Sequence, residues 1–360
     1  MTSRRFFLYF LAFFLAIAAF NVIVWNLATR DLLTCRNGHC PGDLARIGYI
    51  TEVLVPKRFH VDLPRRHFDY RLWKGERVDV LTVGDSFSFG GGRGRNAFYQ
   101  DYIASLQGLS VLNIPIYRED PVQTVIYLLN NGWLDGVRPR IVLIETVERA
   151  CIGSFAREMD FTAVEPMEKI DRDYRRRVYD YETTLPAVGF VNDGNFKYVL
   201  YRLFYHLSDR AFFSKVCRVK TDRTLFSAGD GRTLLFGVFD LLDLPKSNEA
   251  TVGKLNENLN RLSAMLKERN IRLMFMPAPD KYNLYREYLA EKKYPESRFF
   301  ELLRKQPKDY GFIDTKRILG EELKKGTVDL YHPDDSHWTW RASERIFREV
   351  RLDDHGRAEK

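Results

Sequence analysis

The sequence predicts an α/β fold with a parallel sheet, preceded by one membrane-spanning helix. Short apolar runs rich in β-branched residues recur along the chain, at 78–83, 109–114, 141–144 and 271–276. Segments of helical length separate or precede these runs, and one much longer apolar run lies near the N-terminus. Strands that alternate with helices form right-handed βαβ units, and such units build a parallel sheet.

The long apolar run extends from Phe6 to Leu27. As a helix it spans about 33 Å, which is enough for one bilayer crossing. Because Arg4 and Arg5 precede it, the positive-inside rule places the N-terminus in the cytoplasm and the rest of the chain outside it. We therefore expect a single-pass inner-membrane protein, anchored by residues 6–27, with its main domain in the periplasm.

A cleaved signal peptide is the alternative reading of this run. Ala16-Ile17-Ala18 has the small-residue spacing of a cleavage site. The apolar run continues beyond that point through Val24 and Trp25, which favours an uncleaved anchor. Both readings export the bulk of the chain.

The four cysteines suit an oxidising compartment. Cys35 and Cys40 could close a small loop, whereas Cys151 and Cys217 could form a second bridge or remain buried thiols. A zinc site on Cys35, His39 and Cys40 is disfavoured, because no second ligand pair at zinc-finger spacing follows. We expect no bound metal and no cofactor.

The composition changes along the chain and indicates its organisation. Residues 31–76 mix charges with proline and glycine, which is typical of a stalk or wrapping segment, with one short strand near 49–54. An aromatic and basic insertion with two or three helices interrupts the alternation at about 151–245. The expected divisions are 1–30 (cytoplasmic N-terminus and anchor), 31–76 (stalk), 77–350 (main domain) and 351–360 (tail). The expected helices of the main domain lie near 97–107, 121–134, 250–269 and 341–350.

The net charge of +8 comes from 56 basic and 48 acidic residues spread over the whole chain. So mild an excess is compatible with a membrane surface or an anionic polymer, and it gives no argument for nucleic acid binding. An apolar content of 45% excludes a disordered chain. We expect a folded exported domain that binds no nucleic acid.

The tripeptide Gly84-Asp85-Ser86 directly follows the first expected strand. A serine at the carboxyl end of a parallel strand lies where open α/β sheets bind their ligands. Gly84 permits a sharp turn, and backbone N–H groups at Ser86 and in the Gly90-Gly91-Gly92 loop could face a developing oxyanion. The alternative is a strand-ending turn in which Asp85 or Ser86 caps a helix.

A second motif, His332 to Thr339, precedes the last expected helix. A serine nucleophile needs a base, usually histidine, and a carboxylate that orients the imidazole. His337 could be the base, with Asp335 or Asp334 as the carboxylate on the same loop. By itself the segment could be a solvated turn with a helix cap, but its combination with the serine motif predicts a serine catalytic site.

These two motifs resemble the first and last blocks of the SGNH/GDSL hydrolases, and more narrowly those of the periplasmic alginate O-acetyltransferases of the AlgJ and AlgX type. The narrower likeness rests on residues 335–339 (Asp-Ser-His-Trp-Thr), and also on 276–285 and 145–149. The resemblance covers about residues 76–350. It implies a three-layer α/β/α SGNH hydrolase-like domain.

The resemblance also implies roles for individual residues: Ser86 as nucleophile, His337 as general base and then acid, and Asp335 as the orienting carboxylate. No Gly-x-Asn-Asp block, which supplies an oxyanion asparagine in ordinary SGNH hydrolases, follows the third strand. Asn113, at the end of the second strand, is then a candidate oxyanion donor, alternatively a turn residue.

Three further residues are candidates for substrate binding, each with a structural role as the alternative. Arg149 and Lys281 could bind an anionic substrate. Tyr282 could stack on a sugar ring or pack a helix.

The function that the resemblance implies is that of an envelope-anchored O-acetyltransferase. It would modify an exported polysaccharide through an acyl-enzyme, with a multi-spanning membrane acyltransferase as the acetyl donor. A carbohydrate esterase with the same triad and water as the acceptor is the second hypothesis. A non-catalytic scaffold or sugar-binding protein is the third, and the complete Ser–His–Asp set argues against it.

Overall fold

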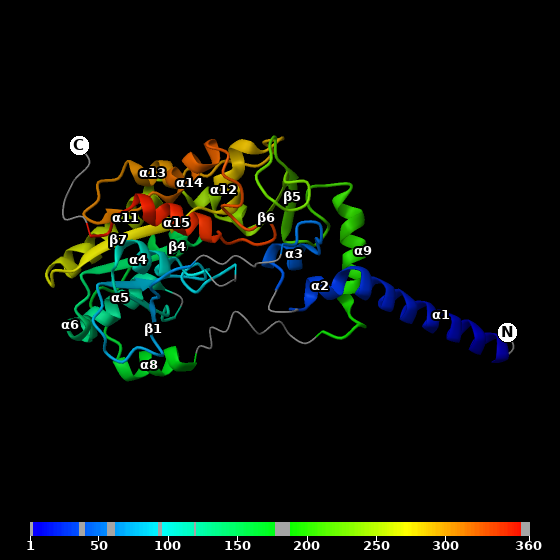
Figure 1. Ribbon diagram of the computed structural model, residues 1–360, viewed down its shortest axis with the longest axis horizontal. Helices are drawn as coiled ribbons and strands as arrows, with labels where there is room; N and C mark the ends of the chain where they lie inside the picture. The colour runs from blue at the N-terminus through cyan, green and yellow to red at the C-terminus, as the bar shows by residue number, and fades with distance from the viewer. Residues whose placement is uncertain are drawn as a thin grey trace.

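A six-stranded parallel sheet with the order β1-β3-β2-β4-β7-β8 forms the centre of the computed structural model (Figure 1). The structure describes residues 3–35, 40–55, 62–92, 96–118, 120–176 and 188–353. The sheet strands are β1 (Phe68–Asp69), β2 (Val80–Val83), β3 (Val111–Ile114), β4 (Ile141–Val147), β7 (Arg272–Ala278) and β8 (Gly311–Phe312). The four strands expected from the sequence are confirmed as β2, β3, β4 and β7, and the two short edge strands are additions.

Helices cover both faces of this sheet, so the fold is the expected three-layer α/β/α arrangement. On one face α4, α14 and α15 pack against alternate strand residues such as Val80 and Leu143. On the other face α5, α7, α11 and α13 pack against Leu81 and Val142. The helices of the two layers are α4 (Tyr99–Gln107), α14 (Thr315–Lys324) and α15 (Trp340–Glu349), and α5 (Pro121–Asn130), α6 (Trp133–Val137), α7 (Glu148–Phe155), α8 (Met167–Arg176), α11 (Glu249–Lys267) and α13 (Phe299–Arg304).

The strand order reverses direction at β2. The chain passes from β2 to its neighbour β3, and then crosses back over β2 to β4 on the other side. Open α/β sheets bind ligands outside the carboxyl ends of their strands at such a reversal. This places the turn that follows β2 at the position where a site is expected.

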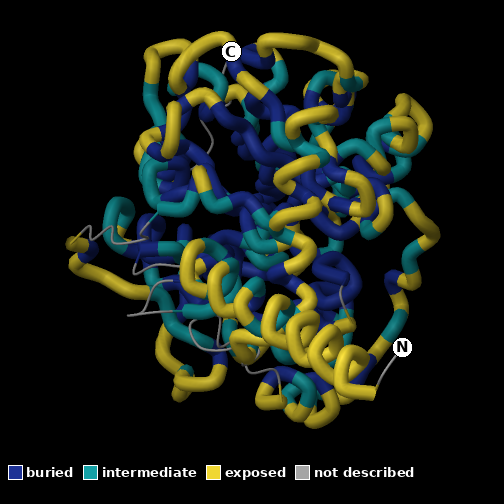
Figure 2. Tube along the Cα trace, turned by 90° about the vertical axis from the view of Figure 1, so that its right-hand side faces the viewer, coloured by how far each residue is buried: buried dark blue, intermediate teal, exposed yellow. Residues whose placement is uncertain are grey.

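The N-terminal helix α1 (Ser3–Val24) projects from the body of the protein (Figure 1). It continues through a π-helical turn, Trp25–Thr29, into α2 (Arg30–Leu33). Most of its surface is exposed (Figure 2). The helix is long and apolar enough to cross a membrane, and it has the features of a membrane anchor or of a signal sequence.

Two parts of the fold differ from the sequence expectation. No strand forms at 49–54, because Tyr49 has a left-handed backbone (φ 53°) that ends the short helix α3 (Asp43–Gly48). The region 151–245 contains helices, including α9 (Asp193–Tyr205), and also an antiparallel pair, β5 (Val216–Lys220) and β6 (Thr233–Gly237), which the sequence did not predict. The remaining short helices are α10 (Phe239–Leu242) and α12 (Lys281–Tyr285).

The cysteines follow two of the readings left open by the sequence. Cys35 and Cys40 form a disulfide, so these thiols are not zinc ligands. Cys151 and Cys217 are separate, buried thiols. His39, the third residue of the disfavoured zinc site, lies outside the described residues.

Candidate active site

The turn that contains Ser86, called the serine turn below, begins where β2 ends. The Asp85 carboxylate accepts the backbone N–H of Phe87 at 3.0 Å and that of Val147 at 2.7 Å, which ties the turn to the end of the neighbouring strand β4. Gly84 is buried, and a Cβ there would overlap the Ser88 hydroxyl, which donates to buried Glu145 at 2.8 Å. Gly84 therefore gives space to this hydrogen bond.

Ser86, His337 and Asp335 form a continuous chain of hydrogen bonds. The Ser86 Oγ lies 2.7 Å from the His337 Nε2. The His337 Nδ1 lies 2.6 Å from the Asp335 Oδ1, and that oxygen also accepts the His337 backbone N–H at 3.1 Å. This is the arrangement of a nucleophile, a base and an orienting carboxylate. The structure thus brings together the three residues that the sequence singled out.

Asp334, the other candidate carboxylate, points away from the imidazole. Its Oδ2 accepts the Gly42 backbone N–H at 2.8 Å, and its carbonyl accepts the Ala45 N–H at 2.9 Å. Asp335, two residues before His337, is therefore the carboxylate that pairs with the imidazole. Asp334 attaches the loop to the segment before α3.

The environment of His337 affects its basicity. Burial lowers the pKa of the imidazole, but the charge and hydrogen bond of Asp335, together with the charges of Asp43 and Asp85, raise it by more. The pKa of His337 therefore lies above its ordinary value, which favours the ring as a proton acceptor from serine.

Asp43, which the sequence did not single out, binds the loop that carries Asp335 and His337, called the acid–base loop below. Its carboxylate accepts the Ser336 N–H at 2.8 Å and the Ser336 hydroxyl at 2.5 Å, and its own N–H donates to the Asp335 Oδ2 at 3.2 Å. No local pattern could have indicated this role, because 292 positions separate Asp43 from Asp335 in the chain.

Asp43, Asp335 and His337 also have the residue types of a metal site. Their ligand atoms lie within 4.8 Å of one another. These atoms already bond within the triad and to Ser336. We therefore assign the three residues to the hydrogen-bond network of the triad.

Lys281 binds the backbone of the loop that carries Asp335 and His337. Its ammonium is buried and donates to the carbonyls of His332 (2.6 Å), Pro333 (3.1 Å) and Asp335 (3.0 Å). Burial lowers the pKa of Lys281 to about 8, although neighbouring aspartates oppose this shift. Since the ammonium is enclosed by backbone carbonyls, the expectation of an anion-binding lysine is wrong.

Asn113 is not positioned as an oxyanion donor. Its amide nitrogen donates to the Ser88 carbonyl at 2.8 Å, its oxygen accepts the Thr82 hydroxyl at 3.0 Å, and the side chain is buried. Asn113 thus fixes the far end of the serine turn. The Gly91 N–H is also used, since it donates to the Ser86 carbonyl at 2.7 Å. The Ser86 N–H has no acceptor within the described part of the chain, so it is a donor available to an oxyanion.

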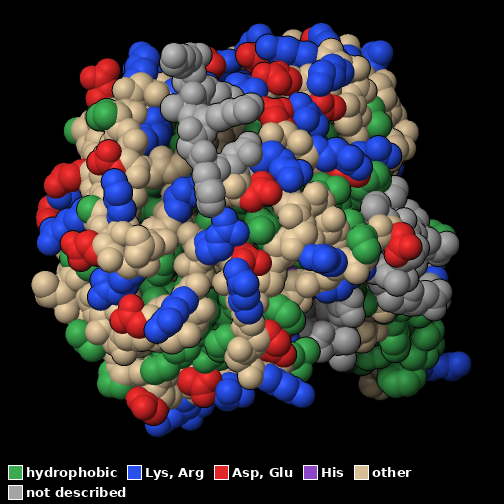
Figure 3. Space-filling model, turned by 60° about the vertical axis from the view of Figure 1, so that its left-hand side comes forward, with side chains coloured by type: hydrophobic (Ala, Val, Ile, Leu, Met, Phe, Trp, Pro, Cys, Tyr) green, Lys and Arg blue, Asp and Glu red, His purple; other side chains and the backbone are tan. Residues whose placement is uncertain are grey.

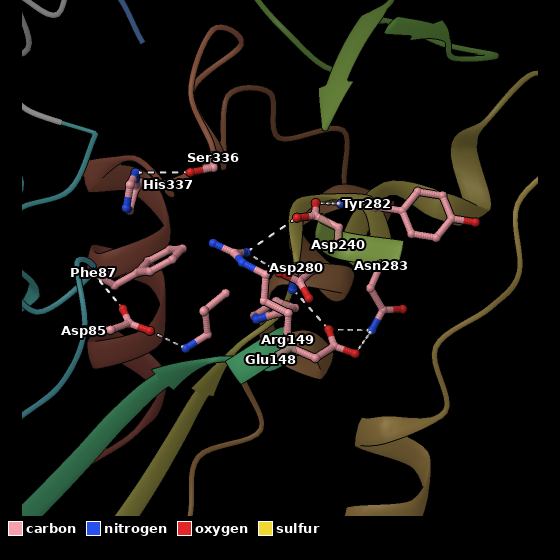
Figure 4. A network of polar contacts seen from close by, with 12 residues as sticks. Asp85, Phe87, Glu148, Arg149, Asp240, Asp280, Tyr282, Asn283, Ser336 and His337 are labelled. Atoms are coloured by element: carbon pink, nitrogen blue, oxygen red, sulfur yellow. Dashed lines mark hydrogen bonds and ion pairs between the residues drawn. The ribbon is translucent and has the colours of Figure 1, made fainter. Parts of the chain in front are cut away.

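Arg149 lies between the acidic side chains of Asp240 and Asp280 (Figure 4). It pairs with both carboxylates and covers the Phe239 ring at 4.9 Å. Burial raises the pKa of Asp240 to about 6, with Arg149 opposing this shift. These ion pairs with two buried carboxylates favour the structural alternative for Arg149.

Tyr282 is also structural. It is buried, and its hydroxyl donates to the carbonyls of Tyr294 (3.0 Å) and Pro295 (2.8 Å). Its ring packs against Phe236 in the β5–β6 pair. A buried ring cannot stack on a sugar, so this expectation is wrong.

Residues 238–351 match the family model described as the SGNH hydrolase-like domain of acetyltransferase AlgX. This part of the chain is therefore similar to the SGNH hydrolase-like domain of the AlgX group. The matched part of this domain includes Lys281, Asp335 and His337, and Ser86 lies outside it. The assignment of Ser86 therefore depends on its hydrogen bond to His337. No curated protein matches the chain as a relative.

Similarity to this group indicates the general chemistry of the domain. SGNH-like domains of the AlgX type suggest acyltransferase or esterase activity. Both reactions use an activated hydroxyl nucleophile, which is what a serine bonded to an oriented imidazole supplies.

Proposed function

We propose that the chain is an envelope-anchored O-acetyltransferase that modifies an exported polysaccharide through an acetyl-enzyme on Ser86. The observation that carries this proposal is the continuous hydrogen-bond chain from Ser86 through His337 to Asp335. The AlgX-type domain match supports acetyl as the group transferred.

The first half-reaction acylates the serine. The Ser86 Oγ attacks the acetyl carbonyl of the donor while the His337 Nε2 removes its proton. Asp335 holds the Nδ1–H and stabilises the imidazolium that forms. The backbone N–H of Ser86 can donate to the oxyanion. The tetrahedral intermediate then releases the donor's leaving group, which takes the proton from His337.

The second half-reaction transfers the acetyl group to the polysaccharide. His337 removes the proton from a sugar hydroxyl, and the oxygen attacks the acetyl-serine carbonyl. Collapse of this intermediate gives the sugar ester and returns the proton to the Ser86 Oγ. Water in place of the sugar would give acetate, so a transferase must bind its acceptor where water would otherwise react.

The location and partners belong to the same proposal. Residues 6–27 anchor the chain in the inner membrane, and the catalytic domain faces the periplasm. A multi-spanning membrane acyltransferase supplies the acetyl group, and the single candidate span found among the described residues suits a chain that receives this group from such a partner.

Replacing Ser86 with alanine tests the proposal. The Ser86→Ala variant of the full chain should lose turnover of a chromogenic acetyl ester and acetyl transfer to oligosaccharides, while its circular dichroism spectrum stays unchanged. Ser208→Ala is a matched control, because Ser208 lies on the surface after α9. Unchanged turnover by Ser86→Ala would contradict the proposal, and acetate as the sole product of the parent chain would identify an esterase instead.

A further inference from the structure

Helix α9 exposes a continuous apolar stripe. Phe196, Val199, Leu200 and Leu203 share one face of the helix, and Leu207 continues this stripe in the turn that follows α9. Their exposed fractions range from 45% at Leu200 to 77% at Leu207. In a protein surrounded only by water, so large an apolar face marks an interaction site.

The opposite face of α9 packs on the protein, so its orientation is fixed. The buried Tyr201 contacts the Tyr49 ring edge-on at 5.5 Å. The Tyr205 hydroxyl bonds to Ser214 at 2.8 Å and to the Val216 carbonyl at 3.0 Å. Since these contacts hold one face, the apolar stripe points outward from the body.

The N-terminal end of α9 contacts the end of the membrane-spanning helix. The Asn195 amide donates to the Asn21 Oδ1 at 2.7 Å, and the Phe196 ring lies 4.6 Å from the Phe20 ring. Asn195 also bonds to Thr29, beyond the apolar run. Figure 1 shows α9 running across the end of α1.

The position of this contact along α1 gives its depth in a bilayer. Asn21 lies six residues before Leu27, the end of the apolar run, and a helix rises about 1.5 Å per residue. The contact is therefore about 9 Å inside the end of the run. Interfacial helices bury their apolar faces by about 5–10 Å, so the contact is at the depth expected of such a helix.

The loop after α9 continues the apolar surface. Phe212 and Phe213 are 61% and 79% exposed, and their ring centroids lie 4.1 Å apart. By contrast, the side of the molecule turned away from α1 intersperses Lys and Arg with Asp and Glu side chains (Figure 3). Phenylalanine and leucine side chains are typical of the apolar faces that segments bury in the membrane interface.

We propose that the apolar stripe of α9 and the Phe212–Phe213 tip lie in the outer interface of the same lipid bilayer that α1 crosses. The occupant of this surface is lipid, because the stripe is continuous with the exposed apolar surface of α1. This inference rests on α1 being retained as an anchor, as in the proposed function.

Membrane contact at α9 would set the orientation of the active site. Tyr201 of α9 packs on Tyr49, which ends α3, and Asp43 at the start of α3 bonds to Ser336 in the acid–base loop. A short chain of contacts thus links the membrane-facing helix to the triad. Two membrane contacts, α1 and α9, hold the domain at one angle, whereas a single anchor leaves it free to rotate.

Spin labels at single introduced cysteines test the proposal in the full chain, reconstituted in vesicles of phosphatidylethanolamine and phosphatidylglycerol. Leu203→Cys carries the label on the apolar stripe, and Leu72→Cys is the matched control, since Leu72 is 76% exposed next to β1. Phe13→Cys reports on α1. The unsubstituted chain gives the background from the native thiols, which are buried. Collision rates are measured with oxygen, which concentrates in lipid, and with a water-soluble nickel complex.

We expect the ratio of oxygen to nickel collision rates at Leu203 to be several-fold higher than at Leu72 and close to that at Phe13. A ratio at Leu203 equal to that at Leu72, with a lipid-like ratio at Phe13, would overturn the proposal and leave the anchor intact. Protection of Leu203 from both reagents would also overturn it, because a second copy of the chain would then cover the stripe. A water-like ratio at Phe13 would contradict the anchor itself. A second label at Val199→Cys, on the same stripe, must agree with Leu203.

Discussion

Replacing Gly91 with alanine tests how closely the glycine loop packs on the catalytic imidazole. A Cβ at Gly91 would overlap the His337 ring and lie 2.6 Å from the Ser86 carbonyl oxygen. Nonbonded heavy atoms pack at about 3.5 Å, so the ring would have to move by about 1 Å. The Ser86–His337 distance is 2.7 Å, and a shift of this size would break that hydrogen bond.

A displacement of about 1 Å in a catalytic group can lower a rate by about 10²-fold. We therefore expect Gly91→Ala to reduce kcat/KM for a chromogenic acetyl ester by about 10²-fold. Gly153→Ala is the matched control, because Gly153 in α7 has no neighbour within 4 Å of an added Cβ. Circular dichroism and thermal unfolding check that each variant folds. Parental activity in a folded Gly91→Ala variant would refute the packing argument.

Three further predictions concern the groups around His337. In steady-state kinetics, Asp335→Ala should lower kcat by about 10³- to 10⁴-fold, and Asp334→Ala should lower it far less. The opposite ranking would assign the orienting role to Asp334. Because the base must be neutral, kcat/KM should rise with pH through the raised pKa of His337. Asp43→Asn removes a negative charge that raises this pKa, so the rise in kcat/KM should move to lower pH. A rise that stays at the same pH would contradict the role of Asp43. Lys281→Met leaves buried carbonyls without a donor and should lower the free energy of unfolding by about 1–3 kcal/mol in chemical denaturation, whereas unchanged stability would show that these bonds contribute nothing.

The sequence predicted the four central strands of the sheet and singled out Ser86, Asp335 and His337, which the fold brings together. Continuous β-branched runs predict buried parallel strands, and β2, β3, β4 and β7 lie where those runs occur. The carboxyl ends of parallel strands meet at one edge, so a serine after the first run was expected at a site. The two-residue edge strands β1 and β8 are too short to give any periodicity.

The sequence was not sufficient for the surroundings of the triad, because burial is decided by contacts between distant segments. The sequence left both an anion-binding and a structural role open for Lys281, and three loop carbonyls enclose its ammonium in the folded chain. Arg149 acquires its role from Asp240 and Asp280, which lie far along the chain. Asp43 lies in a segment expected to be a stalk, and its contact with Ser336 exists only in the folded chain.

The unpredicted β5–β6 pair shows a second limit of sequence patterns. Val216–Lys220 and Thr233–Gly237 are five-residue strands with a 12-residue connection, so neither a tight turn nor a long apolar run indicates them. The pair is stabilised by packing, for example that of Phe236 on Tyr282.

The central claim is that Ser86 carries the acetyl group between donor and sugar, and mass spectrometry of the full chain tests it most directly. The chain is mixed with an acetyl donor, digested, and analysed before and after addition of candidate oligosaccharides. The account predicts one acetyl group on the peptide that contains Ser86, its loss when the acceptor is added, and an acetylated sugar as the product. Acetylated sugar formed equally well by the Ser86→Ala variant, with no acetyl group on that peptide in the parent chain, would contradict it.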